Sequence, residues 1–130
     1  MAVPVTALYG SLNAILNIAL AIRVSNQRTR DKVALGTGDA QESALLVRIR
    51  THANNAEFVP LAILMLLIAE LSGGASVWLH VIGGSLLAAR IAHVPGMERP
   101  APNAARLAGN LITWLDVIAT SIWVLWLRSK

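Results

Sequence analysis

Four long apolar stretches separated by short breaks constrain this 130-residue chain more than any other feature. A helix needs about 20 apolar residues to cross a hydrocarbon core of ~30 Å. The breaks contain the glycine, proline and charged residues that end such segments. The pattern predicts an all-α integral membrane protein, a bundle of four transmembrane helices in a single domain over residues 1–130. The stretches are residues 1–22, 43–71, 77–93 and 106–127, and the breaks are residues 23–41, 72–76 and 95–102.

Composition excludes several other classes of protein. Hydrophobic residues make up 55% of the chain and charged residues 14%, whereas soluble domains carry about 25% charged residues. The absence of cysteine excludes a disulfide scaffold and a thiolate metal site, so any thiol must come with the substrate. Three scattered histidines do not predict a metal site. The net charge of +4 does not indicate nucleic acid, because the arginines lie at segment ends, as they do beside membranes.

The arginines also predict an orientation. In a four-helix chain the first and third loops share one side of the membrane. By the positive-inside rule that side is cytoplasmic, which places both termini outside. The first loop and its helix ends hold Arg23, Arg28, Arg30, Lys32, Arg48 and Arg50; the third holds Arg90, Arg99 and Arg106; the opposite side has only Arg128 and Lys130.

Polar side chains within the second stretch form the strongest candidate site. Arg50, Asn54 and Glu57 follow one another at i, i+4 and i+7, so they share one helical face. Arginine binds a carboxylate through a bidentate fork, and glutamate accepts from an ammonium group. The face therefore suits a zwitterionic ligand. The alternative is that Arg50 and Glu57 only pair with neighbouring helices.

Further polar residues occupy the other stretches. Arg90 and His93 share a face near the end of the third, where His93 is either a substrate contact or an ordinary hydrogen-bonding residue. Arg106 begins a polar stripe on the fourth, and Asp116 lies off that stripe as a candidate partner for another helix. On the first stretch, Asn13 and Asn17 are interpreted as helix–helix hydrogen-bonding residues. The pair Gly83–Gly84 indicates a close approach between helices.

The run Arg50-Thr-His-Ala-Asn54-Asn-Ala-Glu57-Phe-Val-Pro60 resembles the signature of the MAPEG family, the membrane-associated proteins in eicosanoid and glutathione metabolism. Residues 21–25 resemble the end of the family's first helix. Arg90 and His93, with Arg106 thirteen residues further on, resemble its turn into the fourth. The loop at residues 32–38 is similar to that of the short-loop bacterial branch. The resemblance covers the chain from about Leu8 to Leu127.

This resemblance implies a homotrimer that binds glutathione at subunit interfaces near the cytoplasmic face, without a metal. It matches Arg50, Asn54, Glu57, Arg90 and His93 to glutathione-binding positions. It matches Arg106 to the arginine that stabilises the glutathione thiolate. The implied activity is that of a glutathione transferase of the microsomal, detoxifying kind. The implied partners are the lipid bilayer, a lipophilic electrophile or peroxide, and further copies of the chain.

The chain departs from the eicosanoid enzymes of the family at three positions. Phe58 and Met97 stand where tyrosines are expected, and Leu107 stands where the prostaglandin synthase has a serine, which argues against that isomerase activity. The lost hydroxyls favour an alternative function, a non-enzymatic membrane protein that binds lipid or acts as an assembly subunit. A small four-helix exporter is a weaker alternative, because such exporters need a carboxylate in the first helix and residues 1–22 contain none.

Overall fold

The computed structural model describes residues 2–38 and 43–129. Met1, Gln41 and Lys130, which the sequence placed at segment boundaries or outside the membrane, lie beyond the described residues. Each helix in the described chain is long and apolar enough to cross a membrane, which confirms the predicted all-helical membrane bundle. The helices are α1 (Pro4–Asp31), α2 (Ala44–Leu71), α3 (Ser76–Met97) and α4 (Ala104–Arg128).

Two of the predicted helix ends are wrong. Helix α1 continues nine residues beyond Ile22 and ends at Asp31; the cap residue Lys32 donates its N–H to the carbonyl of Arg28 and turns the chain out of the helix with a left-handed backbone (φ 57°). Residues 23–31 contain neither glycine nor proline, so the helix extends past its apolar part with polar side chains. Helix α3 likewise runs through Pro95 to Met97. A proline near the end of a helix removes one backbone hydrogen bond without stopping the chain from turning.

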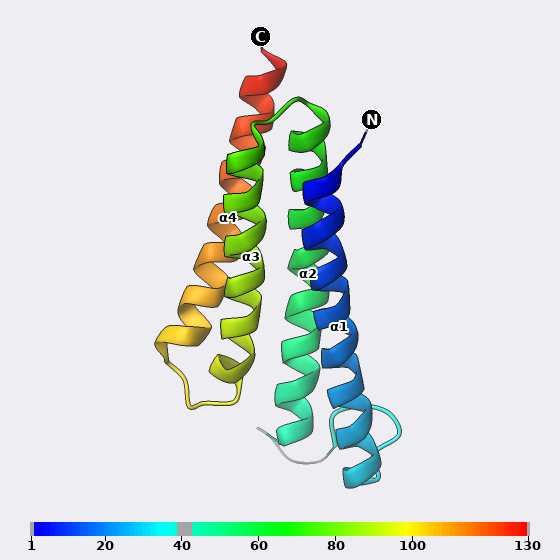
Figure 1. Ribbon diagram of the computed structural model, residues 1–130. Coiled ribbons are helices and arrows are strands. Elements are labelled where there is room, and N and C mark those ends of the chain that lie inside the picture. The colour runs from blue at the N-terminus through cyan, green and yellow to red at the C-terminus, as the bar shows by residue number, and fades with distance from the viewer. Residues whose placement is uncertain (1, 39–42, 130) are drawn as a thin grey trace.

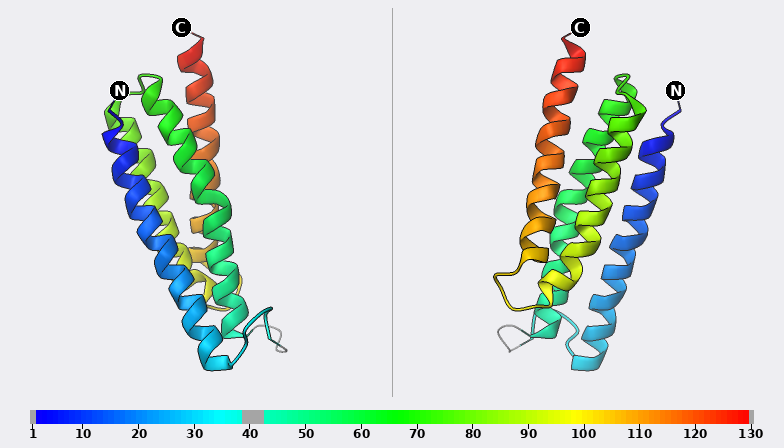
Figure 2. Two further views of the ribbon diagram at one scale, coloured as in Figure 1. Left: turned by 90° about the vertical axis from the view of Figure 1, so that its right-hand side faces the viewer. Right: turned by 60° about the vertical axis from the view of Figure 1, so that its left-hand side comes forward.

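The helices run side by side in an elongated bundle (Figures 1 and 2). Both termini and the α2–α3 turn lie at one end, which we call the terminal end. The α1–α2 and α3–α4 connections lie at the other, which we call the loop end. In the described chain α2 and α3 each contact all the other helices, whereas α1 and α4 do not contact each other. The helix bounds place Glu57 at the middle of α2 and the other predicted site residues in the half of the bundle nearer the loop end.

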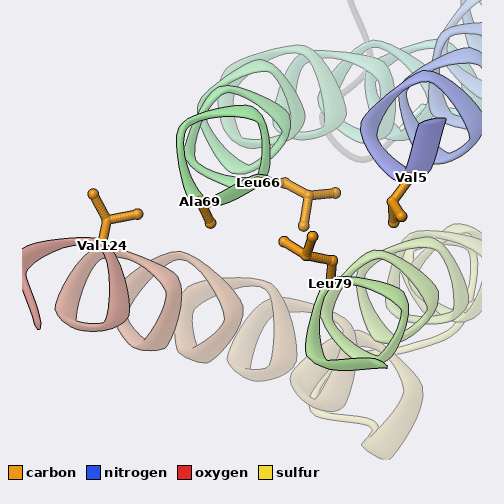
Figure 3. Packing of buried hydrophobic residues seen from close by; sticks show 5 residues of the cluster. All are labelled: Val5, Leu66, Ala69, Leu79 and Val124. Atoms are coloured by element: carbon orange, nitrogen blue, oxygen red, sulfur yellow. The ribbon is translucent and has the colours of Figure 1, made fainter. Parts of the chain in front are cut away.

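A cluster of buried apolar residues lies at the terminal end of the bundle. Val5, Leu66, Ala69, Leu79 and Val124 come together there from all four helices (Figure 3). The same end is tied by Glu70 on α2, whose two carboxylate oxygens accept from the backbone N–H groups of Val5 and Thr6 at 3.0 and 2.7 Å. These are donors that the first turn of α1 could not satisfy within the helix.

Polar pairs link the helices further along the bundle. The Nδ2 of Asn55 on α2 donates to the Oδ1 of Asn17 on α1 at 3.0 Å, which confirms the helix–helix role predicted for Asn17. Asn13 differs, because its amide donates back to the carbonyl of Tyr9 in its own helix. The interhelical partner of Asp116 on α4 is Ser85 on α3, with 2.9 Å between Ser85 Oγ and Asp116 Oδ1.

Candidate functional site

The predicted polar face of α2 is present and partly open. Arg50 and Glu57 are exposed, and Asn54 between them is half-buried. Because a helix rises 1.5 Å per residue, Arg50 and Glu57 lie about 10 Å apart along α2. Within residues 2–38 and 43–129, neither charged side chain forms an ion pair or a hydrogen bond. The protomer thus presents a cation and an anion that lack partners on a membrane-spanning helix, and such groups mark functional sites.

Arg90 of α3 hydrogen-bonds to Asn54 from the interior of the protomer. The Nη1 of Arg90 donates to the Oδ1 of Asn54 at 2.8 Å, and its Nη2 donates to the backbone carbonyl of Gly109 on α4 at 2.7 Å. Arg90 is only 1% exposed. A single guanidinium therefore joins α2, α3 and α4 in the interior of the protomer.

Gly109 permits this arrangement because it has no side chain. A Cβ at this position would lie 2.7 Å from the Cβ of His93 and 3.0 Å from the carbonyl oxygen of Ala89. Helices α3 and α4 therefore touch backbone to backbone here, which brings the Gly109 carbonyl within reach of Arg90. The same carbonyl also accepts from the hydroxyl of Thr113 at 2.8 Å.

His93 lies one turn beyond Arg90 and is also enclosed. Its side chain is 2% exposed, and its Nε2 has no hydrogen-bond partner among the described residues. The sequence predicted that Arg90 and His93 share a face, and the structure places both on the inward face of α3. They therefore do not lie on the same surface as Arg50 and Glu57, although all four had been assigned to one ligand.

Arg106 is carried by the first turn of α4 at the loop end. Asn103 caps this helix, since its Oδ1 accepts from the backbone N–H of Arg106 at 2.9 Å. The Nδ2 of Asn103 donates to the carbonyl of Gly96 at 2.8 Å, which ties the start of α4 to the end of α3. Arg106 is half-buried, and its guanidinium makes no hydrogen bond or ion pair to the part of the chain that the structure describes.

Sequence reasoning missed the residues that hold this site in place. Gly96, Asn103 and Gly109 had no assigned role, although a Ser, Thr, Asp or Asn just before an apolar segment is a recognisable cap signal and Asn103 fits it. Phe58 of α2 packs against Trp114 of α4 with 6.2 Å between ring centroids. Its ring therefore joins α2 to α4 at the edge of the site.

Comparison with known proteins adds a family match. A model of the MAPEG family matches residues 6–126, a range that includes every predicted site residue. The inner membrane protein YecN of Escherichia coli strain K12 is 33% identical over 122 residues, which cover 94% of this chain and 91% of the relative. The protein of the same name in the O6:H1 strain CFT073 gives the same values.

Proposed function

Because the chain belongs to the MAPEG family, we propose that it is a membrane-bound transferase of the glutathione type. It binds glutathione, holds the thiol as a thiolate and directs it to lipophilic electrophiles or peroxides within the bilayer. The observation that carries the proposal is the pair of exposed, unpaired charges on α2, Arg50 near the loop end and Glu57 at the middle of the helix. A peptide with a carboxylate and an ammonium group would satisfy both charges.

The residues fit glutathione in kind and in spacing. Arg50 is free to bind a carboxylate through its guanidinium fork, and Glu57, about two turns along the same face, accepts from the ammonium group of the γ-glutamyl residue. Asn54 between them adds an amide. Arg90 and His93 are enclosed within the protomer, so we assign them to the support of this face and of α4 rather than to direct contact in the resting protomer.

Arg106 is the proposed catalytic residue. A thiol of pKa ~8.5 is mostly protonated at neutral pH, and only the thiolate is a good nucleophile. A guanidinium in a partly desolvated position favours the anion, and the half-buried Arg106 has no partner in the described chain that would compete. In a conjugate addition the thiolate sulfur forms the new S–C bond with its electron pair. The proton released on ionisation leaves to water, and water returns one to the adduct.

Three further features belong to the same proposal. The protein lies in the bacterial inner membrane, with the loop end in the cytoplasm and both termini outside, as the distribution of arginines supports. Its copies assemble as a homotrimer, in which the polar face of α2 is covered at a subunit interface. An unpaired polar group facing lipid is costly, and such an interface removes the exposure of Arg50 and Glu57.

One observation favours a second candidate, a non-enzymatic membrane protein of the same fold that binds lipid or serves as an assembly subunit. Phe58 gives no hydroxyl at a position where some relatives contact glutathione, and its ring instead packs on Trp114. The unpaired Arg106 opposes this alternative, because a merely structural arginine would be expected to have acquired a partner.

The two candidates are separated by thiol binding and turnover of the detergent-solubilised protein. We expect Arg106→Ala to abolish the ultraviolet absorbance of bound thiolate while retaining much of the affinity for glutathione. We expect Arg50→Ala to weaken glutathione binding about tenfold or more, since a charge-assisted hydrogen bond contributes ~1.5–3 kcal/mol.

Arg128→Ala is the matched control, because Arg128 lies on the same helix as Arg106 but at the terminal end. Its binding and thiolate absorbance should equal those of the wild type. A full thiolate signal in Arg106→Ala contradicts the catalytic assignment. Wild-type protein that neither binds glutathione nor shows a thiolate supports the non-enzymatic candidate.

A further inference from the structure

The buried arginine on α3 has a consequence for the face of α2 that the ligand would meet. We propose that Arg90 fixes the side-chain amide of Asn54 with its NH₂ group turned outward, so that Asn54 acts as a hydrogen-bond donor to an anionic group of the bound thiol substrate. Arg90 is then a positioning residue that acts through Asn54. The inference rests on the proposed function, because it concerns the same site.

The orientation of the amide follows from the chemistry of its partner. An asparagine offers an acceptor oxygen on one side and a two-proton donor on the other, whereas a guanidinium offers donors only. The atom of Asn54 that lies 2.8 Å from Arg90 Nη1 must therefore be the oxygen. The Nδ2 is left facing the other way. It bonds to no described residue, and it is not among the buried polar atoms that lack a partner, so it keeps accessible surface.

The hydrogen bond from Arg90 to Asn54 is reinforced by a second contact of the same guanidinium. Its second terminal nitrogen is bonded to the Gly109 carbonyl at 2.7 Å, and its side chain is enclosed on all sides at 1% exposure. The close contact of α3 and α4 at Gly109 fixes the position of that carbonyl. The guanidinium is thus anchored on α4 and presents its remaining end to α2.

The outward NH₂ changes what the α2 face can recognise. Arg50 and Asn54 lie one turn apart and both become donors, and Glu57 remains the acceptor. Two adjacent donors followed by an acceptor suit a carboxylate next to an ammonium group, as in an α-amino acid. An amide turned the other way would place an acceptor beside Arg50 and would repel a carboxylate.

The test compares two replacements of Arg90 that both remove the guanidinium, which bonds to Asn54 and Gly109 at once, but that differ in donor character. Lysine, like arginine, only donates, so Arg90→Lys should keep the Asn54 oxygen inward. Glutamine carries both an acceptor and a donor, so Arg90→Gln allows the Asn54 NH₂ to turn inward. Both variants should be less stable than the wild type, with similar melting temperatures in detergent. In equilibrium dialysis with glutathione, Arg90→Lys should bind within a few fold of the wild type, and Arg90→Gln about tenfold more weakly.

The variant Asn54→Asp is an independent test of the same proposal. Aspartate keeps an oxygen for Arg90, so the melting temperature should not fall, but it replaces the outward NH₂ by a second oxygen. We expect glutathione binding to weaken about tenfold to a hundredfold. Asn55→Ala is the control, since it removes the neighbouring amide and its bond to Asn17 without touching the ligand face. It should lower the melting temperature and leave the affinity unchanged.

Equal affinities of the two Arg90 variants, or wild-type affinity in Asn54→Asp, would overturn the assignment. Failure of the wild type to bind glutathione would contradict the proposed function and is recognised separately. In that case the side-chain NH₂ signals of Asn54 in nuclear magnetic resonance spectra decide the orientation alone. Rapid exchange of these protons with water supports an outward NH₂, and protection from exchange refutes it.

Discussion

Gly96 offers a stringent test of how the end of α3 positions Arg106. A Cβ at this position would lie 2.9 Å from both the Cα of Arg106 and the carbonyl carbon of Ala105, and closer still to the backbone nitrogen of Arg106. Since ordinary contact begins at 3.4 Å and the opposing atoms are backbone, relief of the closest contact requires the first turn of α4 to move by about 1 Å. We therefore expect Gly96→Ala to affect both stability and the site.

The expected size follows from two opposing contributions. Overpacking a close contact costs about 1–3 kcal/mol, and replacing a helical glycine by alanine returns about 0.5–1 kcal/mol. The net free energy of unfolding should fall by up to about 2.5 kcal/mol. A displacement of about 1 Å near reacting atoms can reduce rate by as much as a hundredfold, so the thiolate signal and turnover should fall more than stability alone would explain.

Gly10→Ala is the matched control for stability. A Cβ there would meet only the side-chain Cγ2 of Ile63, at 3.6 Å, so the variant should gain about 0.5–1 kcal/mol. Both variants would be unfolded reversibly in mixed micelles, with helicity followed by circular dichroism and bound thiolate by ultraviolet absorbance. If Gly96→Ala is as stable as Gly10→Ala and retains its thiolate, the contact at the end of α3 does not position Arg106.

Two other predictions concern the protein in its membrane. The native chain has no cysteine, so a single cysteine at Leu35, which is 88% exposed, should resist an impermeant thiol reagent in intact cells, whereas a cysteine at Ser72 in the opposite turn should react. The reverse labelling pattern would invert the proposed orientation. Native mass spectrometry in mild detergent should give a mass of three chains, and a mass of one or two would remove the proposed subunit interface.

The membrane helices could be predicted from the sequence because one physical quantity dominates there. A charged side chain in hydrocarbon is so costly that the uncharged stretches mark the spanning segments directly. The same quantity says nothing about where a helix ends in water, and this is why the end of α1 was placed at Ile22 rather than Asp31. Polar helix-forming residues continue the backbone hydrogen bonds beyond the bilayer without any apolar signal.

For the candidate site, helical periodicity predicted which residues share a helix face, but not which faces point into the protomer. Periodicity places Arg50, Asn54 and Glu57 on one face and Arg90 with His93 on another, and the structure agrees. Whether a face points inward depends on how closely neighbouring helices approach, and here that approach is set at Gly109. Gly83 gave a correct signal of this kind, since a Cβ there would overlap the ring of Tyr9. Gly109 also marks a close approach between helices, but it is a single glycine without a neighbouring one, so the sequence did not single it out.

The burial of Arg90 and His93 argues for a division between the groups that organise the site and those that meet the ligand. Buried polar atoms cost about 1–3 kcal/mol each when unpaired, and His93 Nε2 and Arg90 Nε both lack partners in the described chain. Both atoms are buried in the protomer, so a peptide or a second copy contacts them only after the groups that cover them have moved. Arg50 and Glu57 are exposed and Arg106 is half-buried, so the proposed ligand would meet them without such a movement. Replacing Arg90 by glutamine should therefore change glutathione affinity and stability together, whereas replacing an outer residue should change affinity or thiolate formation alone.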